Sequence, residues 1–75
     1  MNDKVFIVIE MQTNGAEVAT ITNKYTESEK ALQKYFQILA AAVTSKVEVH
    51  TAVIMTETGR VIRAEHFKHE TEVEE

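Results

Sequence analysis

The sequence predicts an α+β protein, a single ββαββ domain in which a four-stranded antiparallel sheet carries one helix on one face. Four segments alternate apolar with polar residues, both glycines lie in turns between such segments, and one helical segment separates the two pairs. Two hairpins joined by a helix bury their apolar faces most simply as one sheet beneath that helix. The 75 residues suffice for one core. We place this domain in residues 4–69 and expect the glutamate-rich residues 70–75 to be a disordered acidic tail.

The first hairpin is predicted from residues 4–12 and 16–23. The first of these segments is β-branched and aromatic, which is typical of a strand. Asn14-Gly15 favours a type I′ turn, because both residues tolerate a positive φ. A two-residue loop at this place would pair Thr13 with Ala16. The face expected beneath the helix then carries Val5, Ile7, Ile9, Met11 and Val18.

A helix is predicted to follow Thr26 and to end at about Thr44. Thr26 and Glu29 have the spacing of a capping box, in which the threonine caps the helix and the glutamate reaches back to the cap. At helical spacing, one apolar stripe contains Leu32, Phe36, Leu39 and Val43, and we expect it to face the sheet. A weaker apolar flank to one side of the stripe contains Ala31, Tyr35 and Ile38.

The second hairpin is predicted from residues 47–57 and 60–69, with Thr58-Gly59 in the turn. A slip of one residue would set apolar residues of the third strand against Arg63 and Glu65, which disfavours that register. The first and third strands are the most apolar, so we expect them at the centre, in the order 2-1-3-4. The preferred register pairs Met55 with Ile62, Val53 with Ala64 and Thr51 with His66.

The sheet face opposite the helix is the predicted interaction surface, since one helix covers only one side. By the register above, this face has an apolar patch among the charged groups of Glu10, Glu48, His50, Arg63 and Glu65. An exposed apolar patch rimmed by charge usually marks an association site. We expect a homo-oligomer, first of all a dimer with the two sheets face to face, with edge pairing of the second or fourth strand as the alternative. The predicted interface residues are Phe6, Val8, Ile21, Ile54 and Phe67.

Several function classes are disfavoured by composition. A net charge of −4 argues against binding nucleic acid, although Phe6 and Phe67 could stack on bases. No apolar run approaches the roughly 20 residues that span a bilayer, so no membrane association is expected. The chain has no cysteine and no glycine-rich phosphate loop, so neither an enzyme nor a cofactor is predicted. The expected location is the cytoplasm, since the apolar stretch of residues 5–9 is too short for the core of a signal peptide.

The histidines are the one chemically suggestive group. The register allows a diagonal cluster of His50, Glu48 and His69, and two imidazoles with a carboxylate can bind zinc. Solvated histidines at a frayed strand end are the preferred reading, so no metal site is predicted. A small-molecule or metal-binding module at a dimer interface, with His50, Glu48 and Glu10 as polar contacts, is the second hypothesis. A catalytic dimer with a cavity between two sheets is the third.

Three runs of the sequence carry a resemblance to a known group of proteins. They are FIVIEMQTNG, the run ILAAAVTSKVEVHTAVIMTETGRVIR that includes the end of the helix, and the closing HFKHE. Together they are similar to small ββαββ proteins encoded in phage and prophage gene clusters of gut bacteria, often beside virion-assembly genes. Those proteins have no assigned activity, so no functional residue carries over. The resemblance implies an accessory or structural role, through self-assembly or through docking to another protein such as a larger virion component. It also implies a location in the cytoplasm of a bacterial host or in the virion.

Overall fold

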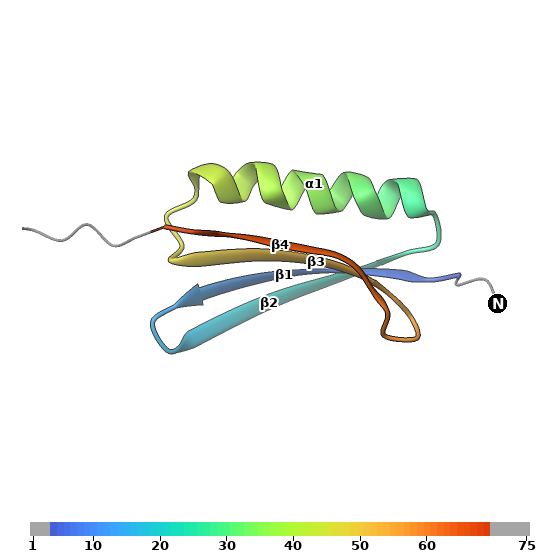
Figure 1. The fold of residues 1–75 in the computed structure, drawn as a ribbon, viewed down its shortest axis with the longest axis horizontal. Helices are drawn as coiled ribbons and strands as arrows, with labels where there is room; N and C mark the ends of the chain where they lie inside the picture. The colour runs from blue at the N-terminus through green and yellow to red at the C-terminus, as the bar shows by residue number, and fades with distance from the viewer. Residues whose placement is uncertain (1–3, 70–75) are drawn as a thin grey trace, which may run out of the picture.

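The computed structural model describes residues 4–69 and confirms the predicted fold class. Every pair of neighbouring strands is antiparallel, the order is β2-β1-β3-β4, and the helix lies along one side of the sheet (Figure 1). The predicted tail, 70–75, lies outside the described residues. The elements are β1 (Phe6–Asn14), β2 (Glu17–Tyr25), α1 (Ser28–Thr44), β3 (Val49–Thr56) and β4 (Val61–Lys68).

The turn of the first hairpin lies one residue later than predicted. Asn14 pairs with Glu17, so the two-residue loop is Gly15-Ala16, and the expected pairing of Thr13 with Ala16 is wrong. Gly15 has a φ of 60°, while Ala16 has no positive φ. This is the pattern of a type II′ turn, in which glycine takes the first central position. Asn14 is therefore the last residue of β1.

The register of the second hairpin is confirmed over most of its length. Val53 pairs with Ala64 and Thr51 with His66. The loop is longer than expected, because Thr56 donates its N–H to the carbonyl of Arg60 at 2.9 Å, across three residues that end in Gly59 with a φ of 92°. A bulge next to this loop restores the predicted register, so that Met55 pairs with Val61 instead of Ile62.

The helix ends at Thr44 as predicted but begins without the predicted capping box. Its N-cap is Glu27, whose side chain makes no capping hydrogen bond. Thr26 lies one residue too early to cap a helix that starts at Ser28. Glu29 lies in the first turn, where a carboxylate interacts favourably with the helix dipole. Helix formation therefore depends on packing against the sheet more than on its N-terminus.

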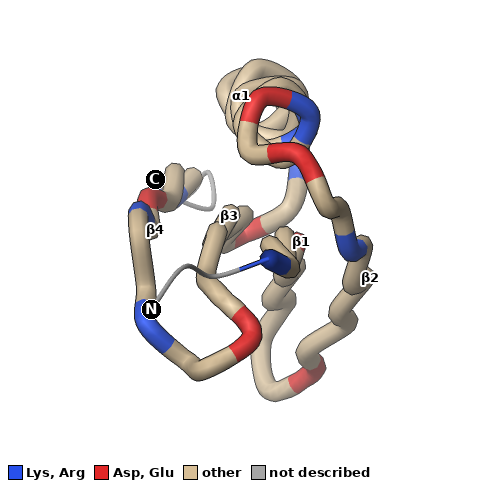
Figure 2. Tube along the Cα trace, turned by 90° about the vertical axis from the view of Figure 1, so that its right-hand side faces the viewer, with Lys and Arg blue, Asp and Glu red and all other residues tan. Residues whose placement is uncertain are grey.

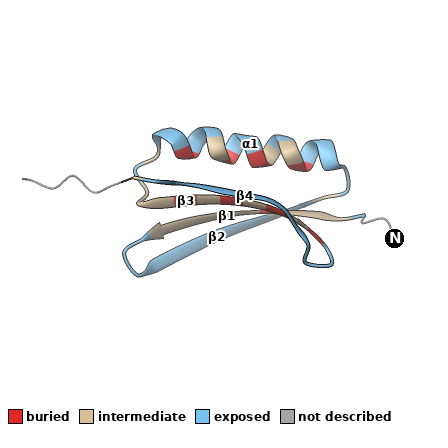
Figure 3. Ribbon diagram, in the orientation of Figure 1, coloured by how far each residue is buried: buried red, intermediate tan, exposed pale blue. Residues whose placement is uncertain are grey.

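The helix buries the flank that the sequence pattern made the weaker one. Its buried residues are Ala31, Tyr35, Ile38 and Ala42 (Figure 3). The expected stripe turns partly outwards, with Phe36 47% and Val43 51% exposed. Small alanine side chains let the helix backbone approach the sheet closely, so the single large ring of Tyr35 can be fully enclosed. The core cluster joins Ala31, Tyr35 and Ile38 to Val8, Ala52 and Ile54 of the sheet.

The two faces of the sheet are therefore the reverse of the prediction. Val8 and Ile54 lie buried beneath the helix, and Phe6 packs against the same core. Ile21 and Phe67 lie on this side as well, on the edge strands, where the narrow helix leaves them 52% and 38% exposed. None of the five predicted interface residues is on the face opposite the helix.

Candidate interaction surface

The face opposite the helix, which we call the open face, consists of the other alternation of each strand. Its centre is apolar and half-buried: Ile7, Ile9 and Met11 of β1, and Val53 and Met55 of β3. Ile7 pairs with Met55 and Ile9 with Val53, so these side chains form continuous rows across the two central strands. No element of residues 4–69 covers this side (Figure 1).

The margins of the open face are polar but carry no carboxylate among the described residues. Met11 has Thr20 on one side and Thr51 on the other. Two lysines stand at diagonally opposite corners, because Lys24 pairs with Ile7 on one edge and Lys68 pairs with Val49 on the other. The remaining margin residues are Thr13, Val18, Thr22, Val61, Ala64 and His66.

Sequence reasoning assigned the centre of this face to the core beneath the helix. The residues of either face are apolar enough to form a core beneath the helix. The two faces differ in their carboxylates. Glu10, Glu17, Glu48 and Glu65 all alternate to the helix side, where the structure gives Glu10, Glu48 and Glu65 specific partners.

A chain of polar groups lies under the helix, centred on His50. Nε2 of His50 lies 2.6 Å from Oε2 of Glu10, and Nδ1 lies 3.0 Å from the Ser45 hydroxyl just after the helix. The side-chain amide of Gln12 donates to the same oxygen of Glu10 at 3.0 Å. Burial raises the pKa of Glu10, but hydrogen bonds from His50 and Gln12 and the charges of His50 and Lys34 outweigh it, so this pKa lies below its ordinary value.

The order serine, histidine, carboxylate is also that of a nucleophile activated by a base. Here His50 is only 3% exposed, and its ring joins Ser45, just after the helix, to Glu10 of β1. The hydroxyl of Ser45 also accepts the backbone N–H of Val47 at 3.2 Å, which ties the end of the helix to the start of β3.

A second polar contact joins the middle of the helix to β4. The buried hydroxyl of Tyr35 donates to Oε1 of Glu65 at 2.6 Å, and a guanidinium nitrogen of Arg63 lies 3.5 Å from that oxygen. Burial and the hydrogen bond to Glu65 raise the pKa of Tyr35 to about 12. The guanidinium also lies 5.2 Å from the ring centre of Phe36. Glu65 and Arg63 therefore connect the edge strand β4 to the helix.

The other two residues of the predicted cluster, Glu48 and His69, make separate contacts. Glu48 accepts the N–H of Gly15 at 2.8 Å, and its own N–H donates to the Asn14 side chain at 3.0 Å. The His69 ring bonds the carbonyl of Ala42 at 2.6 Å, near the end of the helix. The structure therefore does not bring His50, Glu48 and His69 together. Residues 4–69 contain no group of three potential ligands that could hold a metal ion.

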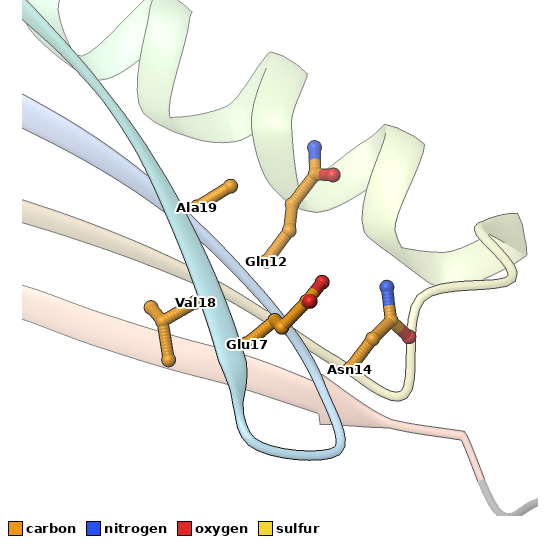
Figure 4. A pocket seen from close by; sticks show the side chains of 5 residues that line it. All are labelled: Gln12, Asn14, Glu17, Val18 and Ala19. Atoms are coloured by element: carbon orange, nitrogen blue, oxygen red, sulfur yellow. The ribbon is translucent and has the colours of Figure 1, made fainter.

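Two surface hollows lie on the helix side of the two edge strands. The first has a volume of about 430 Å³ beside β2, where Asn14, Gln12 and Ala19 point towards the helix (Figure 4). Glu17 and Val18 complete its lining. The second, of about 360 Å³, lies between the helix and β4 and is lined by Leu39, Ala64, Glu65, His66 and Phe67.

Comparison with family models, with curated proteins and with solved structures finds no significant match to this chain. Within residues 4–69, α1 is neither long nor apolar enough to cross a membrane.

Proposed function

We propose that this chain is a small, non-enzymatic interaction protein that self-associates, two copies packing their open faces together. The observation that carries the proposal is the apolar centre of that face, with Ile7, Ile9, Met11, Val53 and Met55 left without a cover by residues 4–69. An antiparallel sheet with a solvated face normally alternates apolar with polar residues there. A second copy would supply the missing layer, as in a sandwich of two sheets.

The size of the open face supports a pair of this kind. Strands of eight and nine residues at about 3.3 Å per residue are about 28 Å long, and four strands spaced about 4.8 Å apart are about 19 Å wide. Each copy therefore offers roughly 500 Å², and a pair buries roughly 1,000 Å². This reaches the size of about 1,000 Å² that a specific interface needs.

The charges on this face also suit a symmetric pair. A two-fold axis in the plane of the interface sets each corner of one sheet over the mirrored corner of the other. Lys24 and Lys68 occupy one diagonal, whereas Val18 and Val61 occupy the other. Each lysine then lies over an uncharged corner of the partner, where its aliphatic stem covers apolar surface and its ammonium group reaches water.

The test replaces Val53, at the centre of the face, by glutamate. The matched control is Val43→Glu on the outer side of the helix, where 51% of the residue is exposed. Sedimentation equilibrium should find dimers for the wild type and for Val43→Glu. Val53→Glu should dissociate at least 100-fold more readily, because each pair would bury two unpartnered carboxylates. Circular dichroism checks that the variant folds. A monomeric wild type, or equal dissociation constants for the two variants, would contradict the proposal.

The alternative of a small-molecule or metal site at the dimer interface lacks its residues on the open face. His50 and Glu10 are bonded to each other beneath the helix, and Glu48 holds the first hairpin turn. Two open faces in contact would therefore enclose neither the pair of His50 and Glu10 nor Glu48. The same placement removes the basis for a catalytic cavity between two sheets.

As a second part of the proposal, which rests on the sequence resemblance alone, we infer an accessory or structural role in a phage or prophage gene cluster. Its test is the gene neighbourhood. Capsid and tail genes beside this gene would support the role, whereas a metabolic operon would contradict it. The sheet-to-sheet pair does not depend on that outcome.

A further inference from the structure

One edge of the sheet is open to another strand. Seen end-on, β2 and β4 form the two edges of the sheet (Figure 2). β4 is guarded by a bulge and by the charges of Arg63 and Glu65, devices that discourage pairing with another chain. β2 has nine residues without a bulge, and Val18 to Thr22 is an uncharged, largely β-branched run.

The hairpin register identifies which peptide groups of β2 are available. In a hairpin with a two-residue loop the closing pair is hydrogen-bonded, and hydrogen-bonded and open pairs then alternate along the ladder. Asn14 and Glu17 form the closing pair. Glu17, Ala19, Ile21 and Asn23 therefore bond to β1. The residues between them, Val18, Thr20, Thr22 and Lys24, point their N–H and C=O groups away from β1.

We propose that β2 pairs edge to edge with β2 of a second copy, antiparallel and centred on Ile21. This register sets Thr20 opposite Thr22 of the partner subunit, and Val18 opposite Lys24 of the partner subunit, so all four outward-pointing residues find hydrogen-bonded partners. The strand carries Glu17 at its first position and Lys24 near its end. An antiparallel pair sets the acidic end beside the basic one, whereas a parallel pair would bring like charges together.

The hollow beside β2 fits the same arrangement. Ala19 and Glu17 line it on the helix side of the strand. In the register centred on Ile21, they lie opposite Asn23 and Tyr25 of the partner subunit. Gln12 and Asn14 also line the hollow, and their side chains point towards the helix (Figure 4).

The resulting assembly is one continuous sheet of eight strands, four from each copy. Its two-fold axis is perpendicular to the sheet, so both helices lie on the same side and the two open faces join into one larger apolar surface. The contact uses different residues from the proposed sheet-to-sheet pair and does not require it. At concentrations at which only the sheet-to-sheet pair forms, the protein is a dimer, and where both contacts form they build assemblies of four or more copies.

Cysteine cross-linking tests the register, because the chain has no cysteine of its own. In the proposed pair, Ile21 faces Ile21 of the partner subunit at an open position, where Cα atoms are about 4.5 Å apart and a disulfide can form. Ile21→Cys should therefore give disulfide-linked dimers under a mild oxidant. Ala19→Cys is the matched control on the same side of the strand, since its sulfur would lie about 13 Å from its copy. At least tenfold slower cross-linking of the control is expected, and equal rates or no dimer from Ile21→Cys would overturn the proposal.

Hydrogen exchange separates this contact from the sheet-to-sheet pair. In the Val53→Glu background, which lacks the latter contact, the amides of Val18, Thr20 and Thr22 should gain protection as the protein concentration rises. Adding Ile21→Lys, which sets two like charges opposite each other, should abolish that gain. Amide protection that does not depend on protein concentration would refute the edge contact. That result would not bear on the sheet-to-sheet pair.

Discussion

Replacing Tyr35 by phenylalanine tests whether one buried hydroxyl fastens the helix to the edge of the sheet. The ring of Tyr35 is fully buried, and its hydroxyl donates to Glu65 at 2.6 Å. Phenylalanine fills the same space, so the substitution removes a hydrogen bond without opening a cavity. It also leaves no buried donor without a partner, and water can reach the half-exposed carboxylate of Glu65.

The expected loss is about 1 kcal/mol in the free energy of unfolding at pH 7. A hydrogen bond to a charged acceptor contributes about 1.5–3 kcal/mol when both groups are dry. Here the contribution is smaller than that range, because Glu65 is half exposed to water and because Arg63 also lies near the same carboxylate oxygen. For a domain of this size, the change lowers the melting temperature by about 4–8 °C.

The pH dependence gives the prediction a second, independent part. Burial and the hydrogen bond to Glu65 raise the pKa of Tyr35 from 10.0 to about 12, so the folded protein favours the neutral phenol. The stabilisation is complete below pH 10 and is lost as the pH rises towards 12. One pH unit above 10 costs the wild type roughly 1.4 kcal/mol, and phenylalanine does not share this cost. The two proteins should therefore become about equally stable near pH 11.

Urea unfolding followed by circular dichroism at pH 7 and pH 11 measures both parts. Tyr25→Phe is the control, because it removes the hydroxyl of the other tyrosine. A Tyr35→Phe variant as stable as the wild type at pH 7 would refute the contribution of the hydrogen bond. A difference of unchanged size at pH 11 would refute the link to the ionisation of Tyr35.

Three further substitutions test the core, the helix start and the polar chain. Ile54→Ala should cost about 3 kcal/mol in urea unfolding, because the residue is 1% exposed and its loss leaves a cavity, whereas Val43→Ala should cost under about 0.5 kcal/mol. Glu27→Ser should raise the melting temperature through a gain of about 0.5–1 kcal/mol, since the present N-cap makes no side-chain bond. Glu10→Gln should be less stable than the wild type at pH 7. A titration of unfolding free energy should show that difference disappear as the pH falls below 4.5, because the lowered pKa of Glu10 stabilises the fold only while the carboxyl is ionised.

The strand order and the second hairpin could be predicted from the sequence because each depends on a pattern with one solution. The apolar character of β1 and β3 leaves them only the centre of the sheet, and one register of β3 with β4 avoids setting apolar residues against charges. The sequence placed Glu10 and His50 on one face but on the open side of the sheet, and it did not predict their direct hydrogen bond, which joins residues 40 positions apart. A signal for it existed. A glutamate and a histidine on one face of two central strands need partners if a helix covers them.

The reversal of the two faces has a single cause in the first turn. In a strand of L-residues, the side to which a peptide group points fixes the face to which its side chain points. The strand order and the hand of the helical crossover fix the side of the sheet on which the helix lies. The residues of β1 whose peptide groups bond to β2 therefore decide which side chains lie beneath the helix. Closing the hairpin at Asn14 and Glu17 instead of Thr13 and Ala16 exchanges the two sets. Both sets are apolar enough for a core, so hydrophobicity could not reveal the error. The outer set then becomes the open face, so the position of one glycine turn decides which apolar residues the helix covers and which it leaves open.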